Sequence, residues 1–188
     1  MRVLALFLFL LPLAAGAADV GGVKIDDRTR VGGTELTLNG AGVRKRLFFE
    51  VYAIGLYVQQ KNANAAQLID QPGPKRVAIH MLRNVSADAF NEALGEGIRA
   101  NHSEAEVKAF EPRLKELGAI MDQVKEARKG MAIGLDWTGT ETQVLINGKP
   151  AGKPIAGADF YKALLKIWLG DKPADTTLKP ALLGEKAS

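Results

Sequence analysis

The sequence of 188 residues contains no cysteine and only two histidines, His80 and His102. Without cysteine the chain forms no disulfide, offers no thiolate nucleophile and has no thiol that could accept a lipid. Neither histidine has a second histidine or a carboxylate at the spacing of a metal site. We therefore expect neither a metal ion nor another cofactor.

The sequence also has little excess of one charge and lacks the common catalytic motifs. Lysine and arginine number 25 and the acids 21, which gives a formal net charge of +4. An excess this small and scattered argues against nucleic-acid partners. A glycine-rich phosphate loop, a Gly-x-Ser-x-Gly elbow and an evident pair of catalytic acids are all missing, which argues against kinases and generic hydrolases.

The longest hydrophobic run lies at the N-terminus. Arg2 precedes an apolar segment that extends to Ala15, and small residues follow. This order is typical of a secretory signal peptide, and the run is too short to cross a hydrocarbon core of about 30 Å as a helix. We predict a signal peptide over residues 1–17, cut near Ala17 or one residue later, and a mature domain over 18–188. The protein is then periplasmic or secreted, without a stable membrane anchor.

About 170 residues remain after the signal peptide, enough for one domain with its own core. Their periodicity predicts strands, then a helical pair, then a hairpin and a last helix, hence an α+β fold with helices on one face of an antiparallel sheet. The predicted strands are two within 23–37, one or two within 44–59 with a bend near Glu50, and 76–82, 131–137 and 142–146. The predicted helices are 62–69, 86–101, one from Ser103, and 158–169. Turns are expected at 39–40 and 147–148.

A candidate site lies in residues 40–57, which read GAGVRKRLFFEVYAIGLY. In a continuous strand alternate side chains share one face, which here carries Arg44, Arg46, Phe48, Glu50, Tyr52 and Ile54. A guanidinium, a phenol and apolar groups on one face suit an amphipathic ligand with one acidic or enolate oxygen. Alternatively the face is solvated and its charges are ordinary surface groups.

Four motifs, taken in order, resemble the chalcone isomerase-like family, in particular its exported bacterial members and the plant fatty-acid-binding proteins of that fold. They are Gly-Ala-Gly-x-Arg at 40–44, Tyr-Ala-Ile-Gly-Leu-Tyr at 52–57, Phe-Asn-Glu at 90–92 and Ile-Trp-Leu-Gly at 167–170. The resemblance covers nearly all of the mature chain. It implies an open-faced antiparallel β-sheet backed by a layer of helices, with a ligand cleft between the two layers.

The resemblance also implies roles for individual residues. Arg44 matches the arginine of the catalytic plant enzymes, and Tyr52 replaces their threonine, as in the fatty-acid-binding branch, where an arginine and a tyrosine hold the carboxylate. Phe90 and Ala93 replace a tyrosine and a lysine, so two donors to a developing oxyanion are missing. The spacing from Arg44 to Tyr52 is shorter than in the plant enzymes, which leaves open whether Arg44 or Arg46 faces the cleft.

We therefore expect a non-catalytic periplasmic protein that holds a fatty acid or a similar apolar acid. The expected ligand-binding residues are Arg44, Arg46, Tyr52, Phe48, Ile54 and Phe90. One alternative is an intramolecular lyase or isomerase acting on a chalcone-like conjugated ketone. Another is an accessory interaction protein whose vestigial cleft is filled by the apolar members of this set.

Four further residues are weighed against these hypotheses. His80 and Arg83 are candidates for the rim of the cleft, although a single histidine in a strand is more often structural. Trp137 and Trp168 are expected in the core or in the cleft wall, because no basic run accompanies either of them.

Overall fold

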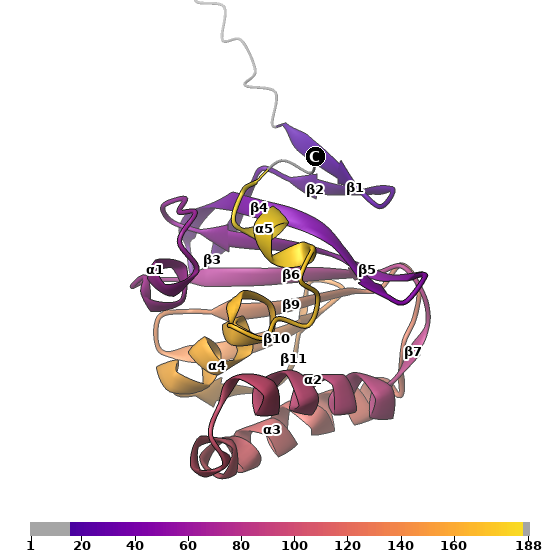
Figure 1. Ribbon diagram of the computed structural model, residues 1–188, viewed down its shortest axis with the longest axis vertical. Coiled ribbons are helices and arrows are strands. Elements are labelled where there is room, and N and C mark those ends of the chain that lie inside the picture. Colours follow the sequence, from indigo (N-terminus) through magenta and orange to yellow (C-terminus); the bar gives the residue numbers. More distant parts are fainter. Residues whose placement is uncertain (1–15, 186–188) are drawn as a thin grey trace, which may run out of the picture.

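The computed structural model describes residues 16–185, and Figure 1 shows a curled antiparallel sheet with helices packed along one side. The sheet has seven strands in the spatial order β11-β10-β9-β6-β5-β4-β3, and every neighbouring pair is antiparallel. The strands are β3 (Arg28–Val31), β4 (Thr34–Arg46), β5 (Phe49–Val58), β6 (Lys75–Met81), β9 (Ala132–Trp137), β10 (Glu141–Ile146) and β11 (Lys149–Ala156). The predicted α+β fold is confirmed.

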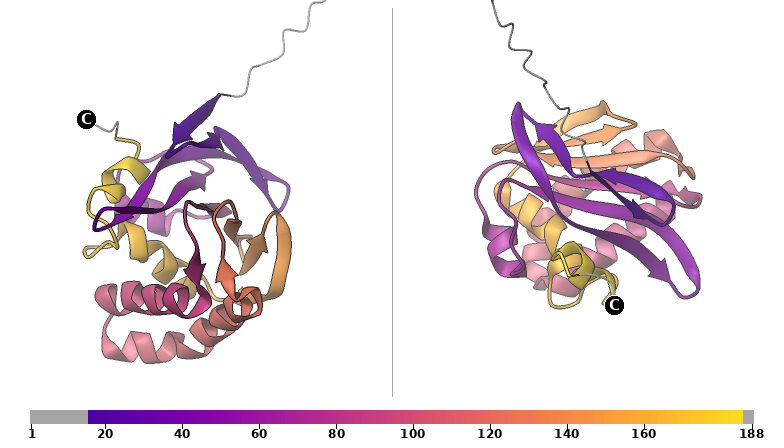
Figure 2. Two further views of the ribbon diagram at one scale, coloured as in Figure 1. Left: turned by 90° about the vertical axis from the view of Figure 1, so that its right-hand side faces the viewer. Right: turned by 90° about the horizontal axis from the view of Figure 1, so that it is seen from above.

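The helices form a layer against the inner face of the sheet. They are α1 (Ala65–Asp70), α2 (Ala87–Asn101), α3 (Glu104–Val124), α4 (Ala158–Leu169) and α5 (Leu178–Leu182), and a short pair, β7 (Val85–Ser86) with β8 (Glu126–Ala127), lies beside α2 and α3. α2 packs against both α3 and α4 (Figures 1 and 2). α4 is buried on nearly every side, which explains its almost continuous apolar sequence.

Local sequence signals set the starts of the two long helices. The Ser86 hydroxyl accepts a hydrogen bond from the Ala89 amide and caps α2. Ser103 and Glu106 form the complete capping box of α3, in which each side chain accepts from the other residue's amide. The predicted Asn147-Gly148 turn joins β10 to β11. These boundaries therefore follow from short-range hydrogen bonding.

A separate hairpin covers the outer face of the sheet. It consists of β1 (Ala17–Val20) and β2 (Val23–Asp26), and it packs Ile25 against Leu38 and Tyr57 in a second, small core. The predicted cut near Ala17 falls at the first residue of β1. The rest of the predicted signal peptide, residues 1–15, lies outside the described residues, so export stays a prediction.

The turn predicted at Asn39 and Gly40 is wrong, because both residues lie inside β4. The buried Asn39 amide donates to the carbonyls of Leu182 and Asn62 and accepts from the Asn62 amide. A Cβ atom on Gly40 would lie 2.1 Å from the carbonyl oxygen of Ala181. Asn39 therefore links β4 to α5 and to Asn62 through buried hydrogen bonds, and the absence of a side chain at Gly40 lets the backbones of β4 and α5 lie close together.

The segment 44–59 is two strands, and the chain reverses at Leu47-Phe48 rather than near Glu50. Arg46 pairs with Phe49 across a turn of two residues, and Leu47 has a left-handed backbone with φ 55°. A register shift follows Arg44, so Val51 has no partner on β4. The strand expected to carry the site residues on one face is therefore a bent hairpin with a bulge.

Candidate functional site

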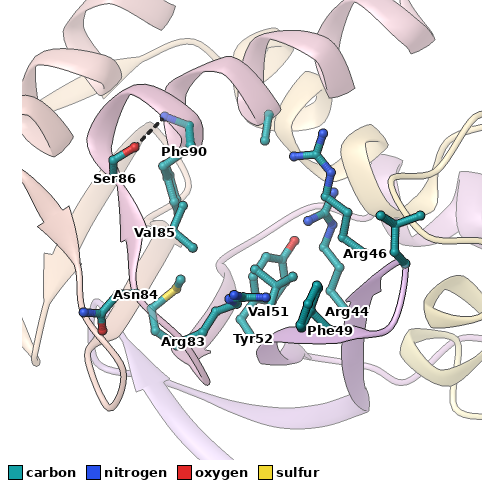
Figure 3. Close-up of a pocket in the computed structure, with 14 residues that line it drawn as sticks. Arg44, Arg46, Phe49, Val51, Tyr52, Arg83, Asn84, Val85, Ser86 and Phe90 are labelled. Atoms are coloured by element: carbon teal, nitrogen blue, oxygen red, sulfur yellow. Dashed lines mark hydrogen bonds between the residues drawn. The ribbon is translucent and has the colours of Figure 1, made fainter.

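Arg44 on β4 and Tyr52 on β5 are direct cross-strand partners. Partners in an antiparallel pair project to the same face, so the guanidinium and the phenol both point toward the helices. The guanidinium carbon of Arg44 lies 5.7 Å from the centre of the Tyr52 ring. Figure 3 shows the two side chains directed into one space below α2.

That space is a cavity of about 340 Å³ between the β4–β5 hairpin, the segment after β6 and the first turns of α2. Its volume falls in the range of about 300–1,000 Å³ that is usual for small-molecule sites. Most of its wall is apolar. The wall is formed by Arg44, Arg46, Leu47, Phe49, Val51, Tyr52, Met81, Arg83, Asn84, Val85, Ser86, Ala89, Phe90 and Ala93.

The charges on this wall are all positive. Three arginines line the cavity, Arg44, Arg46 and Arg83, and none of the lining residues is an acid. Within residues 16–185 none of the three forms an ion pair. The Nε atom of Arg44 is buried without a hydrogen-bond partner. A buried donor of this kind costs stability until an acceptor reaches it, so the cavity suits an anion.

Tyr52 is held in place from behind by α4. The indole N–H of Trp168 donates to the Tyr52 hydroxyl oxygen at 2.8 Å. Burial raises the pKa of the Tyr52 phenol to about 12, although the charge of Arg44 acts in the opposite direction. The phenol is therefore protonated near neutral pH, and its own hydrogen remains available to an acceptor in the cavity.

A smaller space of about 50 Å³ continues inward from the same residues. It shares Arg44, Tyr52, Phe90 and Ala93 with the main cavity. Its inner wall is apolar and consists of Ile79, Leu94, Leu135, Ile167, Trp168 and Ala174. Arg44 and Tyr52 thus lie where the outer cavity meets the apolar core.

The α2 side of the cavity presents no hydrogen-bonding side chain near Arg44 and Tyr52. Phe90 and Ala93 line both spaces, as expected from their place on the helix. The nearby Asn91 turns away, because its amide donates to Asp122 and to the Gly118 carbonyl on α3. The wall opposite the arginine and the tyrosine is therefore formed by hydrocarbon.

The expected site residues do not all meet at the cavity. Arg44, Arg46, Tyr52 and Phe90 line it, and Arg44 also borders the inner space while Arg46 does not. The remaining two lie elsewhere: Phe48 is 96% exposed on the turn, and Ile54 is buried in the core with 1% exposure. The turn at 47–48 separates these residues, since it ends the alternation that grouped them.

The four further residues weighed in the sequence analysis also lie in different places, and two of them line the cavity or its inner extension. Arg83 lines the cavity and stacks over Phe49, with its guanidinium carbon 4.4 Å from the ring centre. His80 pairs with Ala53 on the opposite face of the sheet from Tyr52, so its placement at the cleft rim is wrong. Trp137 stacks on Tyr161 in the core, whereas Trp168 forms part of the inner cavity wall, as its sequence context allowed.

Sequence reasoning missed several lining residues for two reasons. Val51 and Tyr52 are adjacent in sequence, yet both line the cavity. In a regular strand their side chains would point to opposite faces, but the bulge at Val51 lets both face the cavity. Ala89 could have been found, because the cap at Ser86 fixes the helix start and a spacing of four residues places Ala89 on the same face as Ala93.

Among residues 16–185, no group of three or more histidine and acidic side chains is placed to hold a metal ion. Over the same residues, no helix combines the length and the apolar character needed to cross a bilayer.

The cavity and the sheet together define a protein of an open-faced antiparallel fold with an internal cavity between its two layers. The sequence model of the chalcone isomerase-like family matches residues 17–184, so the chain belongs to this family. Among solved structures it is similar to a fatty-acid-binding protein of Arabidopsis thaliana, with a TM-score of 0.68 and 15% identity over 86% of this chain and 92% of that chain. At this identity the likeness concerns the fold. A search of curated proteins found no significant match.

Proposed function

We propose that the protein binds a fatty acid or a similar apolar acid, with the carboxylate at Arg44 and Tyr52. The observation that carries this proposal is the unpaired, buried Nε of Arg44 beside Tyr52 in a cavity whose wall is mostly apolar. The fold that it shares with a plant fatty-acid-binding protein supports the same ligand class.

The chemistry of the two side chains fits a carboxylate. Arginine offers paired donors to the two oxygens, and such charge-assisted bonds are about twice as strong as neutral ones. The Tyr52 phenol, kept protonated by its raised pKa, adds a third donor. Because Trp168 already donates to the Tyr52 oxygen, the phenolic hydrogen is polarised toward the ligand.

The hydrocarbon part of the ligand lies along the apolar wall of the outer cavity. Val51, Met81 and Phe90 form this wall together with two hairpin residues, Leu47 and Phe49. Arg46 and Arg83 line the same cavity. Burial of apolar surface contributes roughly 25 cal/mol per Å². The acyl chain of a fatty acid therefore adds binding affinity that a short carboxylic acid does not gain.

Binding without catalysis is the function that the cavity wall favours. Isomerisation of a conjugated ketone needs donors aimed at the developing oxyanion, and losing one costs about 2.7–4 kcal/mol of barrier. Phe90 and Ala93 face the cavity where such donors would lie on α2. A vestigial cleft filled by Phe48, Ile54 and Phe90 is disfavoured, because those residues are apart and about 340 Å³ is open.

We also propose that the protein works in the periplasm or outside the cell. The support is the signal-peptide pattern of residues 1–17. N-terminal sequencing of the protein from a periplasmic extract should give a first residue at or next to Ala18. A full-length chain that stays in the cytoplasmic fraction would contradict this location.

Native mass spectrometry of the protein purified from cells tests the ligand. We expect a bound fatty acid, and titration of the stripped protein with acyl chains should show affinity that rises with chain length. Arg44→Ala should weaken binding about tenfold to a hundredfold, because a charged hydrogen bond is lost. Arg30→Ala, at an exposed arginine on β3, is the matched control and should bind normally.

Two results would contradict the proposal. One is a protein without co-purified lipid whose affinity for acyl chains does not depend on Arg44. The other is loss of chalcone absorbance faster than the uncatalysed rate, which would assign the cavity to the isomerase alternative.

A further inference from the structure

The β4–β5 turn carries the exposed large apolar side chains of the described chain. Leu47, Phe48 and Phe49 are consecutive and are 83%, 96% and 56% exposed. Figure 1 shows this turn, which we call the hairpin tip (residues 47–49), projecting at the same end of the molecule as β7. Exposed apolar residues scattered singly are ordinary, but three in succession on a projecting turn mark an interaction site.

The backbone of the tip is unfavourable for its residues. Leu47 adopts the left-handed conformation with φ 55° in a turn of two residues. Such turns strongly prefer glycine, asparagine or aspartate at left-handed positions, because the Cβ atom crowds the backbone there. A leucine and a phenylalanine at this turn are thus explained neither by local folding preference nor by burial in the core.

Positive charges surround the tip. Lys45 and Arg46 precede it, and Arg83 stacks on the ring of Phe49. Two acids lie nearby. The Glu50 carboxylate is 3.9 Å from the Lys45 ammonium, and the Asp175 carboxylate accepts a hydrogen bond from the Lys45 backbone amide. Neither forms an ion pair with Arg46 or Arg83. An apolar tip within a basic surround is complementary to a bilayer surface that contains anionic lipid.

The shape of the tip favours a bilayer over a folded protein partner. A stable protein interface buries about 800 Å² on each side, which needs a broad surface of 20–30 residues. A turn of two residues offers a narrow projection, suited to insertion between headgroups. Phenylalanine is also a usual apolar residue of elements that insert at this depth.

The tip is continuous with the opening of the cavity. Leu47 and Phe49 line the cavity, and Figure 3 shows Phe49 beside it. Phe48 is exposed to solvent and contributes neither to the cavity nor to the core. Insertion of Phe48 into a membrane would therefore bring the arginine-lined side of the cavity to the headgroup region, where fatty-acid carboxylates lie.

We propose that the hairpin tip docks the protein reversibly on bilayers containing anionic lipid, with Phe48 inserted and Arg46 and Arg83 at the headgroups. The docking rests on the tip and the basic residues around it, and does not depend on the proposed function. The consequence that ligand exchanges between cavity and bilayer rests on the proposed function.

Co-sedimentation with vesicles tests the docking. The full mature chain, stripped of ligand, is mixed with vesicles of phosphatidylcholine alone or of an equal mixture of phosphatidylcholine and phosphatidylglycerol. We expect binding to the mixed vesicles that weakens as salt is added. Phe48→Ser should lower the partition coefficient about tenfold or more, because one large apolar side chain no longer inserts.

Two variants serve as matched controls. Phe48→Trp should retain binding, and its fluorescence should be quenched by brominated lipid, whereas the native Trp137 and Trp168 are buried and should not be. Lys61→Gln removes an exposed charge beyond Val58, at the other end of β5, and should leave binding unchanged.

Equal vesicle binding by Phe48→Ser and the parent protein would overturn the proposal, as would the absence of binding by both. Self-association that Phe48→Ser abolishes, without vesicle binding, would also overturn it and assign the tip to a second copy of the chain. The experiments distinguish failure of the docking proposal from failure of the proposed function. Phe48→Ser should keep its acyl-chain affinity in detergent-free solution, and Arg44→Ala should keep its vesicle binding within about fivefold.

Discussion

Trp168 on α4 and Tyr52 on β5 are joined by a buried hydrogen bond of 2.8 Å across 116 positions of sequence. The bond ties the most buried helix to the strand that carries the candidate site. It also fixes the orientation of the phenol, because the indole is packed between α4 and the sheet. The position of the site thus depends on the core behind it.

We predict that Tyr52→Phe lowers both stability and ligand affinity. Removing the hydroxyl leaves the buried Trp168 N–H without an acceptor, which costs about 1–3 kcal/mol of unfolding free energy. Urea denaturation measures the first effect and acyl-chain titration the second. Tyr57→Phe is the control, because Tyr57 lies on the same strand but faces the other side, where it donates to the Asp26 carbonyl. It should bind ligand normally; equal binding by both variants would contradict the assigned role of Tyr52.

Filling the cavity from α2 should abolish binding without unfolding the protein. Ala93 lines both the outer and the inner space, so Ala93→Leu places a branched side chain directly beside Arg44 and Tyr52. We expect acyl-chain affinity to fall below detection by titration calorimetry while the melting temperature stays within a few degrees. Ala100→Leu, at an exposed position on the same helix, should leave affinity unchanged. Full affinity in Ala93→Leu would place the ligand outside this cavity.

We predict that the stability of the protein depends on pH through the buried Lys75, whether or not a ligand is bound. Its side chain is 3% exposed, and burial lowers the pKa of its ammonium from 10.5 to about 8. The unfolded chain therefore binds more protons than the native state between about pH 8 and 10.5, so this residue makes stability rise with pH in that window. Below pH 8 the buried charge opposes folding, by up to about 3 kcal/mol.

The comparison with Lys75→Met isolates this effect. Relative to the variant, the native protein should gain unfolding free energy as the pH rises from 7 to 10. The buried tyrosines titrate alike in both proteins and cancel in the difference. Lys61→Met, at an exposed lysine, should show no such trend. A difference between parent and Lys75→Met that is flat with pH would show that Lys75 is hydrated in solution.

Gly40 should be intolerant of any side chain because of α5. A Cβ atom there would meet the backbone carbonyl of Ala181, which cannot move without displacing the helix. We expect Gly40→Ala to cost about 1–3 kcal/mol and to speed hydrogen exchange in α5. Gly42→Ala should cost less, because its Cβ would meet only the side chains of Leu178 and Ala181. Equal costs would mean that α5 is loosely docked.

Much of the fold could be predicted because its signals are local. The caps at Ser86 and Ser103 and the Asn147-Gly148 turn depend on hydrogen bonds within a few residues, and all three are found where expected. Asn39 and Gly40 misled the prediction, because residues typical of turns serve here in contacts with Asn62 and with α5. Such a use is invisible until distant segments are placed together.

The candidate site was predicted less completely than the fold. Arg44 and Tyr52 do share a face, yet through cross-strand pairing and not through alternation along one strand. Phe48 was assigned to the ligand because nothing in its neighbours marks a turn, and the left-handed Leu47 contradicts ordinary preference. The bulge at Val51 has no sequence signal of its own, which is why this residue of the outer wall went unnoticed.

The bulge at Val51 has a consequence for how the hairpin can be altered. The irregular pairing lies between the Arg44–Tyr52 pair and residues 45–50, so changes beyond it do not alter the register that orients the two polar groups. The pairing that orients Arg44 and Tyr52 is therefore independent of the length of the turn beyond it. A tip of different length or polarity, grafted between Lys45 and Glu50, would keep the Arg44–Tyr52 pairing but would replace Arg46, Leu47 and Phe49, and with them one side of the outer cavity.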